Sequence, residues 1–582
     1  MNNEETIFRV QNLSVSFRTN EGLRKALHDI SFDIERGKTL AIVGESGSGK
    51  TVSSLCMMQL LQKEKAIFES GKFQFKGATF FSEEQKDYDI SPNGEILKTL
   101  RGKGVAMIFQ EPMTSLNPVK TCGEQVTEML RRHLGISRQE SIERTLALFG
   151  EVRLPRPEEM LDQYPHQLSG GQRQRVMIAM AISCDPQILI ADEPTTALDV
   201  TVQKEILALL KSLQKKHRMA ILFITHDLGV VSEIADDIVV MRQGRVVEKG
   251  RAAAVLENPQ HPYTKGLLAC RPEPGKKSNR LKTVADYLNN DHQILPDVPI
   301  ASDKAESSTK AIDILQVNHL TKIYNDSGSI FRKASSPVKA VNDVSFTISK
   351  GETLGLVGES GCGKTTLSRM LLGLIPSSEG EILYHIPGEG GNQRNIASLS
   401  KEELRRLRKD IQIIFQDPYS ALNPKHTVGD AITEPMHVFG LHHDDKTRRQ
   451  KTIELLEKVG LGEEYFGRYP HEFSGGQRQR IVIARALACE PSFIICDESV
   501  SALDVSVQAQ VLNLLNDLKK DFALTYLFIS HDLNVVYYMS DRIMVMNKGI
   551  IEELGTSDDI FFRPQREYTK KLLAAIPGKG HF

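Results

Sequence analysis

The chain has 582 residues, and a single hydrophobic core stops growing near about 250–300 residues, so more than one domain is expected. Hydrophobic residues make up 40% and charged residues 25%, which is ordinary for a globular protein and excludes disorder over most of the length. The 73 Lys and Arg residues balance the 74 Asp and Glu residues to a net charge of −1, so the composition lacks the basic excess that nucleic-acid-binding proteins usually carry.

The seven cysteines are scattered, and none belongs to a C-x-x-C pair. This pattern predicts neither a disulfide framework nor a zinc knuckle and favours a reducing compartment. The first residues, Met1–Glu5, lack the basic and apolar regions of a secretory signal. Apolar runs such as Val176–Ile182 are too short to cross a bilayer, which needs about 20 residues. If the protein works at a membrane, we expect another subunit to hold it there.

The second half of the chain repeats the first. The sequence GESGSGKT at 44–51 returns as GESGCGKT at 358–365, and SGGQRQR at 169–175 returns letter for letter at 474–480. The offset is 314 residues for the first motif and 305 for the second, which places extra residues in the first copy, in our interpretation within the polar stretch 82–94. A long repeat of this kind indicates a duplicated domain rather than a solenoid.

The duplication divides the chain into a first domain over 1–270, a linker over 271–311 and a second domain over 312–582. The linker is rich in Pro, Ser and charged residues without apolar periodicity, and we expect one short helix around Val284–Leu288. Each domain opens with alternating apolar residues, which predict a strand. They are Val10, Leu13, Val15 and Phe17 in the first domain and Ile314, Val317, Leu320 and Ile323 in the second.

Each copy contains the pattern G-x-x-x-x-G-K-[ST] between an apolar run (39–43 and 353–357) and a helix-compatible stretch (52–61 and 366–374). Its glycines let the backbone turn N–H groups inward, and the following helix adds its positive end. A glycine-rich turn without a ligand is the alternative, which two matches in register disfavour. We expect the lysine to reach the outer phosphates and the last threonine to bind Mg²⁺. The candidate phosphate-binding residues are Gly44, Ser46, Gly47, Ser48, Gly49, Lys50, Thr51, Gly358, Ser360, Gly361, Cys362, Gly363, Lys364, Thr365 and Thr366.

An apolar run ends in two acidic residues in each copy, at 188–193 and at 493–498. Buried parallel strands have this composition, and ligands gather at their carboxyl ends. Asp192 and Asp497 are therefore candidates to complete the metal site, and Glu193 and Glu498 are placed beside it to polarise a water molecule. A strand entering a capped turn is the alternative, which the neighbouring phosphate loop disfavours.

A histidine follows another apolar run in each copy, as Thr225-His226-Asp227 and Ser530-His531-Asp532. A strand followed by a helix cap would explain the pattern, because Thr and Asp favour the cap position. Its recurrence favours contact between the imidazole and a γ-phosphate.

The repeated Ser-Gly-Gly-Gln segments precede apolar stretches and predict helix N-termini, which attract anions. Each domain already has a phosphate loop, so a second anion-binding helix end suggests that it serves the nucleotide of the neighbouring domain. A capped helix without a ligand is the alternative. The residues are Ser169, Gly170, Gly171, Gln172, Ser474, Gly475, Gly476 and Gln477.

These motifs in this order, together with Gln110 and Gln416, resemble ABC-type ATPase domains, and the likeness covers nearly the whole chain outside the linker. The Leu-Asn-Pro segments at 110–118 and 416–424 and the His-Pro-Tyr-Thr tail at 261–264 are similar to the ATPase subunits of bacterial importers for dipeptides, oligopeptides, glutathione and nickel. The chain resembles a fused double ATPase of a glutathione or peptide importer.

The resemblance implies an α/β fold with two tandem P-loop ABC-type nucleotide-binding domains, whose helical insertions at about 115–180 and 421–485 carry the signature motif. ATP would be held between the phosphate loop of one half and the Ser-Gly-Gly-Gln helix of the other. It also implies roles for further residues. Glu193 and Glu498 would be general bases, His226 and His531 would hold the γ-phosphate, Gln110 and Gln416 would sense Mg²⁺ and water, and Phe17 and Tyr324 would stack on adenine.

The same resemblance implies an ATPase coupled to solute import, peripheral to the cytoplasmic face of the bacterial plasma membrane. Its partners would be two integral-membrane permease subunits and an extracytoplasmic solute-binding protein, without nucleic acid, and ATP would bring its own two halves together. Only Cys270 follows the tail motif where related subunits often carry several cysteines, so no iron–sulfur centre is expected. Phe473 and Ser499 depart from the family pattern and leave open whether the two sites hydrolyse at equal rates.

Two other functions are weighed against import. A soluble twin ABC ATPase acting on ribosomes or DNA is disfavoured by the neutral charge and by a linker that is not a long charged helix. A regulatory nucleotide-binding scaffold without turnover is disfavoured because every polar catalytic position is present in both copies. The sequence does not identify the solute, so glutathione, dipeptides, longer peptides, opines and nickel chelates all stay open.

Overall fold

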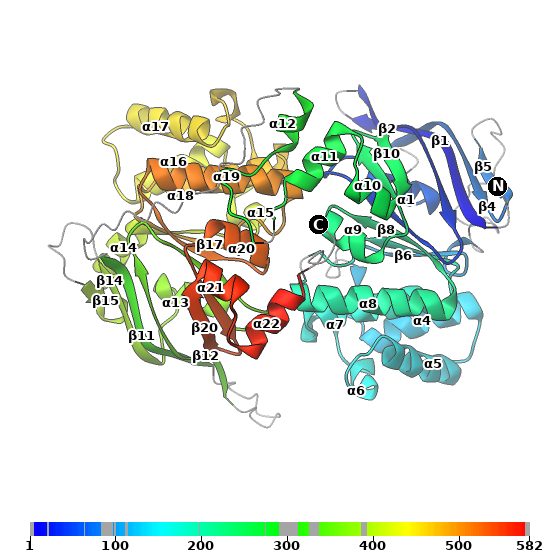
Figure 1. The fold of residues 1–582 in the computed structure, drawn as a ribbon, viewed down its shortest axis with the longest axis horizontal. Helices are drawn as coiled ribbons and strands as arrows, with labels where there is room; N and C mark the ends of the chain where they lie inside the picture. The colour runs from blue at the N-terminus through cyan, green and yellow to red at the C-terminus, as the bar shows by residue number, and fades with distance from the viewer. Residues whose placement is uncertain are drawn as a thin grey trace.

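The computed structural model describes residues 5–19, 22–62, 65–82, 97, 100–110, 115–196, 198–273, 275–289, 312–324, 337–385 and 393–576. Both halves have the same architecture, with an antiparallel sheet beside a larger and mostly parallel one, and helices around them (Figure 1). This confirms the predicted duplicated α/β fold with mixed sheets. Most of the stretch predicted to hold extra residues (83–94) and the later part of the predicted linker (290–311) lie outside the described residues.

The antiparallel sheet has the strand order β2-β1-β4-β5 in the first half and β12-β11-β14-β15 in the second. The strands predicted at the start of each domain are confirmed as β1 and β11. Val10 of β1 lies between its register partners Phe32 and Phe73, and all three side chains are buried. The strands are β1 (Thr6–Thr19), β2 (Gly22–Glu35), β4 (Ala66–Phe75), β5 (Ala78–Ser82), β11 (Asp313–Tyr324), β12 (Val338–Ser349), β14 (Glu379–His385) and β15 (Gln393–Asn395).

The larger sheet has the order β6-β7-β8-β3-β9-β10 in the first half and the corresponding order β16-β17-β18-β13-β19-β20 in the second. All its pairs are parallel except the edge pairs β9–β10 and β19–β20. Continuous apolar runs suit its inner strands because both faces are covered. The strands are β3 (Thr39–Val43), β6 (Val105–Ile108), β7 (Ile188–Asp192), β8 (Ala220–Thr225), β9 (Asp237–Arg242), β10 (Arg245–Arg251), β13 (Thr353–Val357), β16 (Ile411–Ile414), β17 (Phe493–Asp497), β18 (Thr525–Ile529), β19 (Arg542–Asn547) and β20 (Ile550–Thr556).

The parallel register gathers the functional motifs at one edge. Val43, Asp192 and Thr225 end the adjacent strands β3, β7 and β8. The phosphate loop, the acidic pair and the histidine segment therefore begin side by side, although they are far apart in the sequence.

The helices of the predicted insertions are present in both halves. The first half contains α1 (Lys50–Met57), α4 (Cys122–Leu134), α5 (Arg138–Glu151), α6 (Pro157–Leu161), α7 (Gly170–Ile182), α8 (Val200–His217), α9 (Leu228–Ile234), α10 (Ala252–Glu257), α11 (Pro262–Ala269) and α12 (Val284–Leu288). The second contains α13 (Lys364–Leu371), α14 (Lys401–Asp410), α15 (Pro418–Ala421), α16 (Val428–Val438), α17 (Asp445–Lys458), α18 (Gly475–Leu487), α19 (Val505–Asp521), α20 (Leu533–Met539), α21 (Ser557–Phe562) and α22 (Glu567–Ala574). In the described part of the chain, no helix combines the length and the apolar character needed to span a bilayer.

Two helices differ from the sequence prediction in their bounds. The helix after each phosphate loop begins at the lysine itself and ends earlier than the apolar pattern suggests. Gln59 and Gly373 adopt left-handed backbone conformations with φ of 51° and 59°, which stops the helical path. The short helix predicted in the linker is confirmed as α12.

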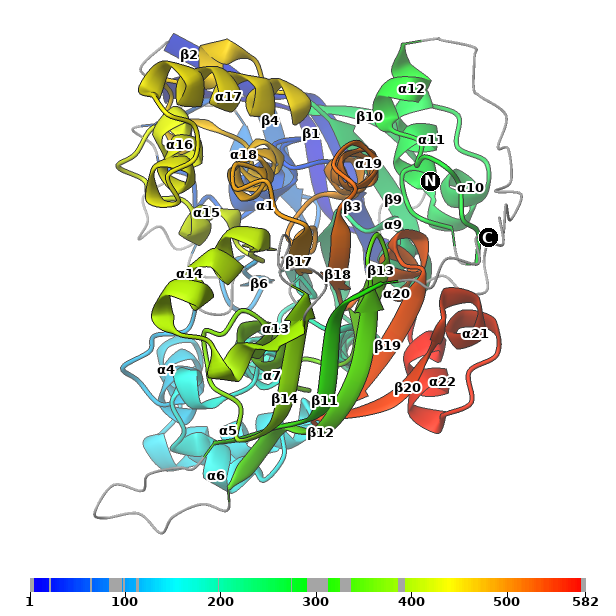
Figure 2. The same cartoon turned by 90° about the vertical axis from the view of Figure 1, so that its left-hand side faces the viewer.

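The linker segment before α12 is not free, because it packs on the second half. Leu281 is buried, and its backbone N–H donates to Oδ1 of Asn513 (2.9 Å) while its carbonyl accepts from Nδ2 of the same side chain (2.8 Å). Lys277 Nζ donates to the Ser540 carbonyl (2.7 Å) and lies 5.1 Å from the centre of the Tyr537 ring. Figure 2, in which the second half stands in front, shows α11 and α12 side by side.

Candidate functional site

The two phosphate loops have the same geometry. Gly49 and Gly363 precede α1 and α13 in left-handed conformations, with φ of 97° and 113°. Lys50 Nζ donates to the carbonyls of Gly44 (2.7 Å) and Glu45 (3.0 Å), so the loop curls around the ammonium group. A Cβ on Gly44 would lie only 2.2 Å from the Met241 carbonyl oxygen, so this position requires glycine.

The second loop repeats these contacts. Lys364 Nζ donates to the carbonyls of Gly358 (2.7 Å) and Glu359 (3.0 Å). A cavity of about 230 Å³ lies against this loop and is lined by Lys364, Thr365 and Thr366 together with Gln416, Glu498 and His531. The structure thus brings the lysine and threonines of the phosphate loop and the predicted glutamine, glutamate and histidine of the second half to one cavity, although Asp497 is not among the described residues that line it.

The Asp192 carboxylate is suited to a hard cation. It is 1% exposed at the end of β7, and Oδ1 accepts a hydrogen bond from Thr51 Oγ1 (3.3 Å). Burial, with the charge of Glu193, raises the pKa of Asp192 to about 6 despite Thr51 and Lys50. Burial likewise raises the pKa of Asp497 to about 6. A bound cation would favour the ionised form of either carboxylate.

The donor set fits Mg²⁺ rather than a metal held by protein side chains alone. Among the described residues, no group of three or more His, Cys, Asp and Glu side chains is placed to hold a metal ion. Mg²⁺ is usually bound by one or two carboxylates together with waters and the phosphates of the substrate. One carboxylate and one hydroxyl beside a phosphate loop match that requirement.

The predicted general base, histidine and glutamine meet in each half. Gln110 Nε2 donates to Glu193 Oε2 (3.0 Å), and His226 Nδ1 lies 3.3 Å from Glu193 Oε1. Burial would raise the pKa of Glu193, but the hydrogen bond and charge of His226 outweigh it and lower the pKa to about 2. Glu193 is therefore kept ionised, as a general base requires.

The second half has the same cluster with small differences. Gln416 Nε2 donates to Glu498 Oε2 (2.8 Å), and His531 Nδ1 lies 3.4 Å from the same oxygen. The pKa of Glu498 is lowered because the contact with His531 outweighs burial. Both glutamates have left-handed backbones, with φ of 46° and 48°. This conformation costs energy in a residue with a Cβ and is typical of functional sites.

Each half also reaches into the phosphate loop of the other. Asp504, which follows Ala-Leu in the second half, accepts a hydrogen bond from the backbone N–H of Ser46 (2.9 Å), and Ser506 Oγ donates to the Glu45 carboxylate. In the opposite direction, Asp199 lines the cavity at Lys364. The two halves are therefore in contact at their nucleotide loops.

The Ser-Gly-Gly-Gln segments are helix N-termini, as predicted. Ser169 caps α7 in a reciprocal arrangement with Gln172, and Ser474 caps α18 in the same way with Gln477. Gly171 packs on α8, where an added Cβ would lie 2.8 Å from Val202. In the described residues around the cavity at Lys364, none comes from 169–172. Contact between this segment and the nucleotide of the other half stays a prediction.

The predicted adenine-stacking residues lie on the antiparallel sheets. Phe17 is half-buried on β1, whereas Tyr324 at the end of β11 is 45% exposed, with Lys322 Nζ lying 5.4 Å from its ring centre. Their role also stays a prediction.

Two tail tyrosines form part of the site, which the sequence analysis did not anticipate. Tyr263 Oη accepts from the Glu45 N–H (3.1 Å) and donates to Glu45 Oε2 (3.2 Å). Tyr568 Oη accepts from the N–H of Glu359 in the same way (3.2 Å). The signal available in the sequence was the recurrence of the tyrosine at the 305-residue offset of the acidic and histidine motifs.

Comparisons with known proteins agree on one family. The family described as ABC transporter matches residues 27–196 and 341–501, and the one described as the C-terminal region of oligopeptide/dipeptide transporters matches 247–295. The glutathione import ATP-binding protein GsiA of Escherichia coli (strain K12) is 47% identical over 98% of this chain and 89% of its own length. Its counterpart from Shigella dysenteriae serotype 1 matches equally well, at 47% over 98% and 89%.

Solved structures match single halves. One described as the dimeric structure of MJ0796, a bacterial ABC transporter cassette, is 28% identical and covers 42% of this chain and 98% of its own, with a TM-score of 0.37.

Replacing Tyr263 with Phe removes the hydroxyl that holds Glu45 and with it the start of the first phosphate loop. Because a hydrogen bond to a charged group contributes about 1.5–3 kcal/mol, we expect ATP affinity at the first site to fall by about tenfold or more. Nucleotide titration by calorimetry measures the change. Tyr287→Phe, on the nearby helix α12, is the matched control, and an unchanged affinity in Tyr263→Phe would remove the tail from the site.

Proposed function

The chain belongs to the ABC transporter family, and from that premise we propose that ATP binding and hydrolysis between its two halves power the uptake of glutathione or small peptides. It is an ATPase subunit of an importer, with two ABC domains in one chain. The observation that carries the proposal is the crossing of the halves, in which Asp504 binds the Ser46 N–H and Asp199 lines the cavity at Lys364.

Each site would work through groups on both halves. The phosphate loop and Lys50 or Lys364 bind the triphosphate, and Thr51 with Asp192, or Thr365 with Asp497, would hold Mg²⁺ with Gln110 or Gln416. When bound, Mg²⁺ would neutralise charge that develops on the phosphates. Glu193 or Glu498 accepts a proton from the attacking water, and His226 or His531 donates to the γ-phosphate. The Ser169 and Ser474 helix ends complete the sandwich when ATP closes the halves.

The protein would act at the cytoplasmic face of the bacterial plasma membrane, bound to two permease subunits that receive solute from an extracytoplasmic binding protein. A cavity of about 410 Å³ beside 420–424 in the second half offers a docking site. There Arg485 donates to the Ala421 carbonyl (2.8 Å) and lies 3.4 Å from Glu434 Oε2. Met180 holds the corresponding position in the first half, so the two surfaces differ and suit two different permeases.

Changing both Glu193 and Glu498 to Gln removes the proton acceptor from each site while keeping its shape. We expect kcat for ATP to fall by about 100-fold or more and the ATP dissociation constant to change little, because general bases contribute about 10²–10⁴-fold to rate. Phosphate release and nucleotide binding are measured on the same preparations. The controls are Glu159→Gln and Glu464→Gln, exposed residues at matching positions of the two halves. Retained turnover in the double variant would exclude the two glutamates as bases.

Cross-linking between introduced cysteines tests directly whether the two halves enclose ATP. The seven native cysteines are buried, so they should not compete for the cross-linker. Ser169→Cys with Ser360→Cys joins the signature of the first half to the phosphate loop of the second. In the Glu-to-Gln background, we expect a short thiol cross-linker to join them much faster with ATP and Mg²⁺ than without. The same-half pair, Ser169→Cys with Ser46→Cys, should not react. A yield that is independent of ATP would contradict closure across the halves.

Arg485→Met gives the second half the residue of the first. We expect co-purification of permease subunits to fall, since the Ala421 and Glu434 contacts are removed, while the ATPase rate of the isolated chain stays within about twofold, as for an exposed ion pair. Met180→Arg is the reciprocal variant. Recovery of ribosomes or DNA with the wild-type chain, in place of membrane subunits, would favour the twin ABC ATPase alternative.

A further inference from the structure

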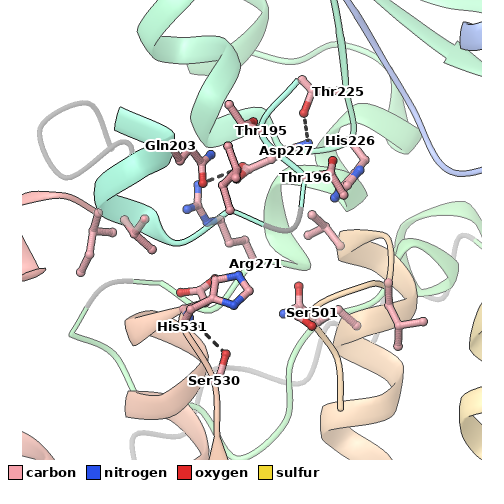
Figure 3. A pocket seen from close by; sticks show the side chains of 17 residues that line it. Thr195, Thr196, Gln203, Thr225, His226, Asp227, Arg271, Ser501, Ser530 and His531 are labelled. Carbon is pink, nitrogen blue, oxygen red and sulfur yellow. Dashed lines mark hydrogen bonds and ion pairs between the residues drawn. The ribbon is translucent and has the colours of Figure 1, made fainter. Parts of the chain in front are cut away.

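A cavity of about 110 Å³ lies between the two halves, and none of the described residues that line it belongs to a phosphate loop. Its walls include His226 and Asp227 of the first half and His531 and Asp532 of the second. Arg271, the residue after the first tail, extends into it and lies between the two histidine segments (Figure 3). The cavity is therefore the place where the two halves can influence each other's histidines.

The pseudo-symmetry of the molecule fails at this cavity. The Ser-Gly-Gly-Gln, acidic and histidine motifs and the tail tyrosines repeat at an offset of 305 residues, and at that offset Arg271 corresponds to Ile576 and Gly229 to Asn534. Both Arg271 and Ile576 line the cavity. One half thus presents a guanidinium where the other presents an aliphatic side chain.

Arg271 acts on the residue next to the predicted γ-phosphate contact. Its Nη1 lies 3.4 Å from Asp227 Oδ1, and its side chain is 22% exposed. Burial would lower the pKa of Arg271, but the carboxylates of Asp227, Asp532 and Glu233 outweigh it. The Asp227 carboxylate also accepts from the Gly229 N–H (2.8 Å) and begins α9. The guanidinium therefore holds the carboxylate that fixes the backbone beside His226.

The exchange at the two positions is coupled. A Cβ on Gly229 would lie 1.7 Å from Arg271 Nη1, so a larger residue there would push the guanidinium out of its present position. Asn534 at the matching position is 1% exposed, and neither its amide nitrogen nor its amide oxygen has a hydrogen-bond partner among the described residues. In the described part of the chain, Asp532 has no ion-pair partner within 4.0 Å. The Arg271 guanidinium is therefore within ion-pair distance of Asp227 in the first half, whereas Asp532 of the second half interacts with its charge only from farther away.

We infer that Arg271, seated on Gly229, is a positioning residue that fixes His226 through Asp227, and that the first ATP site consequently turns over faster than the second. The inference rests on the proposed function, because it assigns His226 and His531 to the γ-phosphate. It adds that the two sites hydrolyse ATP at different rates. In the second half, Ile576 takes the place of Arg271 and can form no ion pair with Asp532.

Vanadate trapping with a photoreactive azido-ATP separates the two sites. The trapped complex forms only after hydrolysis, and mass spectrometry of the labelled peptides assigns the label to a half. In Arg271→Met we expect the ratio of first-half to second-half label to fall by about threefold or more, within the range of a partly exposed ion pair. Arg271→Lys should restore most of it, and KM for ATP should change less than kcat. Ile576→Met, at the matching position, should leave the ratio unchanged.

A second set of variants exchanges the residues at positions 229 and 271 with those at 534 and 576. Because each combination already occurs in one half of the protein, these variants keep the test valid if Arg271→Met does not fold. Gly229→Asn with Arg271→Ile gives the first half the residues of the second and should lower the ratio as Arg271→Met does. Asn534→Gly with Ile576→Arg should raise second-half label. An unchanged ratio in both first-half variants, or an equal loss of label from both halves, overturns the inference. Absence of trapped label from both halves of the wild type contradicts the proposed hydrolysis itself, and with it this inference.

Discussion

The hydrogen bond from the Ser46 N–H to Asp504 joins a phosphate loop of one half to the other half. A phosphate loop presents backbone donors to anions, and a carboxylate that occupies one of these donors competes for the place of a phosphate oxygen. Glu45 adds a second connection, because its carboxylate accepts from Ser506 of the other half and from Tyr263 of its own tail. ATP entering the first site must displace or rearrange the contacts made by Asp504 and Ser506, so binding is coupled to the relative position of the halves, whereas the Tyr263 contact lies within one half and supports the loop.

The two sites have nearly the same inner residues in different surroundings. Thr51 donates to Asp192 and Gln110 to Glu193, and the glutamine–glutamate contact repeats in the second half. The surroundings differ at the crossing contacts, where Asp504 binds a backbone N–H while Asp199 lines an open cavity. Both sites must bind the same nucleotide, so the residues that face it are the same in the two copies. Contacts to the other half and to other subunits do not share this requirement and can differ.

The elements that carry the motifs could be predicted from sequence for a physical reason. Strands β3 and β13 coincide with the predicted runs 39–43 and 353–357, because a fully buried parallel strand must be apolar throughout. The left-handed backbones of Glu193 and Glu498 could not be predicted, since such a conformation depends on the surrounding fold. Tyr263 was equally hidden, because its bond to Glu45 joins residues 218 positions apart. The Pro-, Ser- and charge-rich composition of 271–311 predicted only a linker, whereas Leu281 within it is buried and hydrogen-bonded to Asn513 of the second half.

These contacts attach most of the described part of the linker to the second half. Lys277 and Leu281 bind the second half, through Ser540 and Asn513, so the segment preceding α12 belongs mechanically to the second half. Arg271 lies only a few residues earlier and binds Asp227 of the first half. The short stretch between them must therefore absorb any change in the distance between the halves. Because Arg271 binds the aspartate next to His226, movement at this junction would reach the predicted γ-phosphate contact of the first site before that of the second.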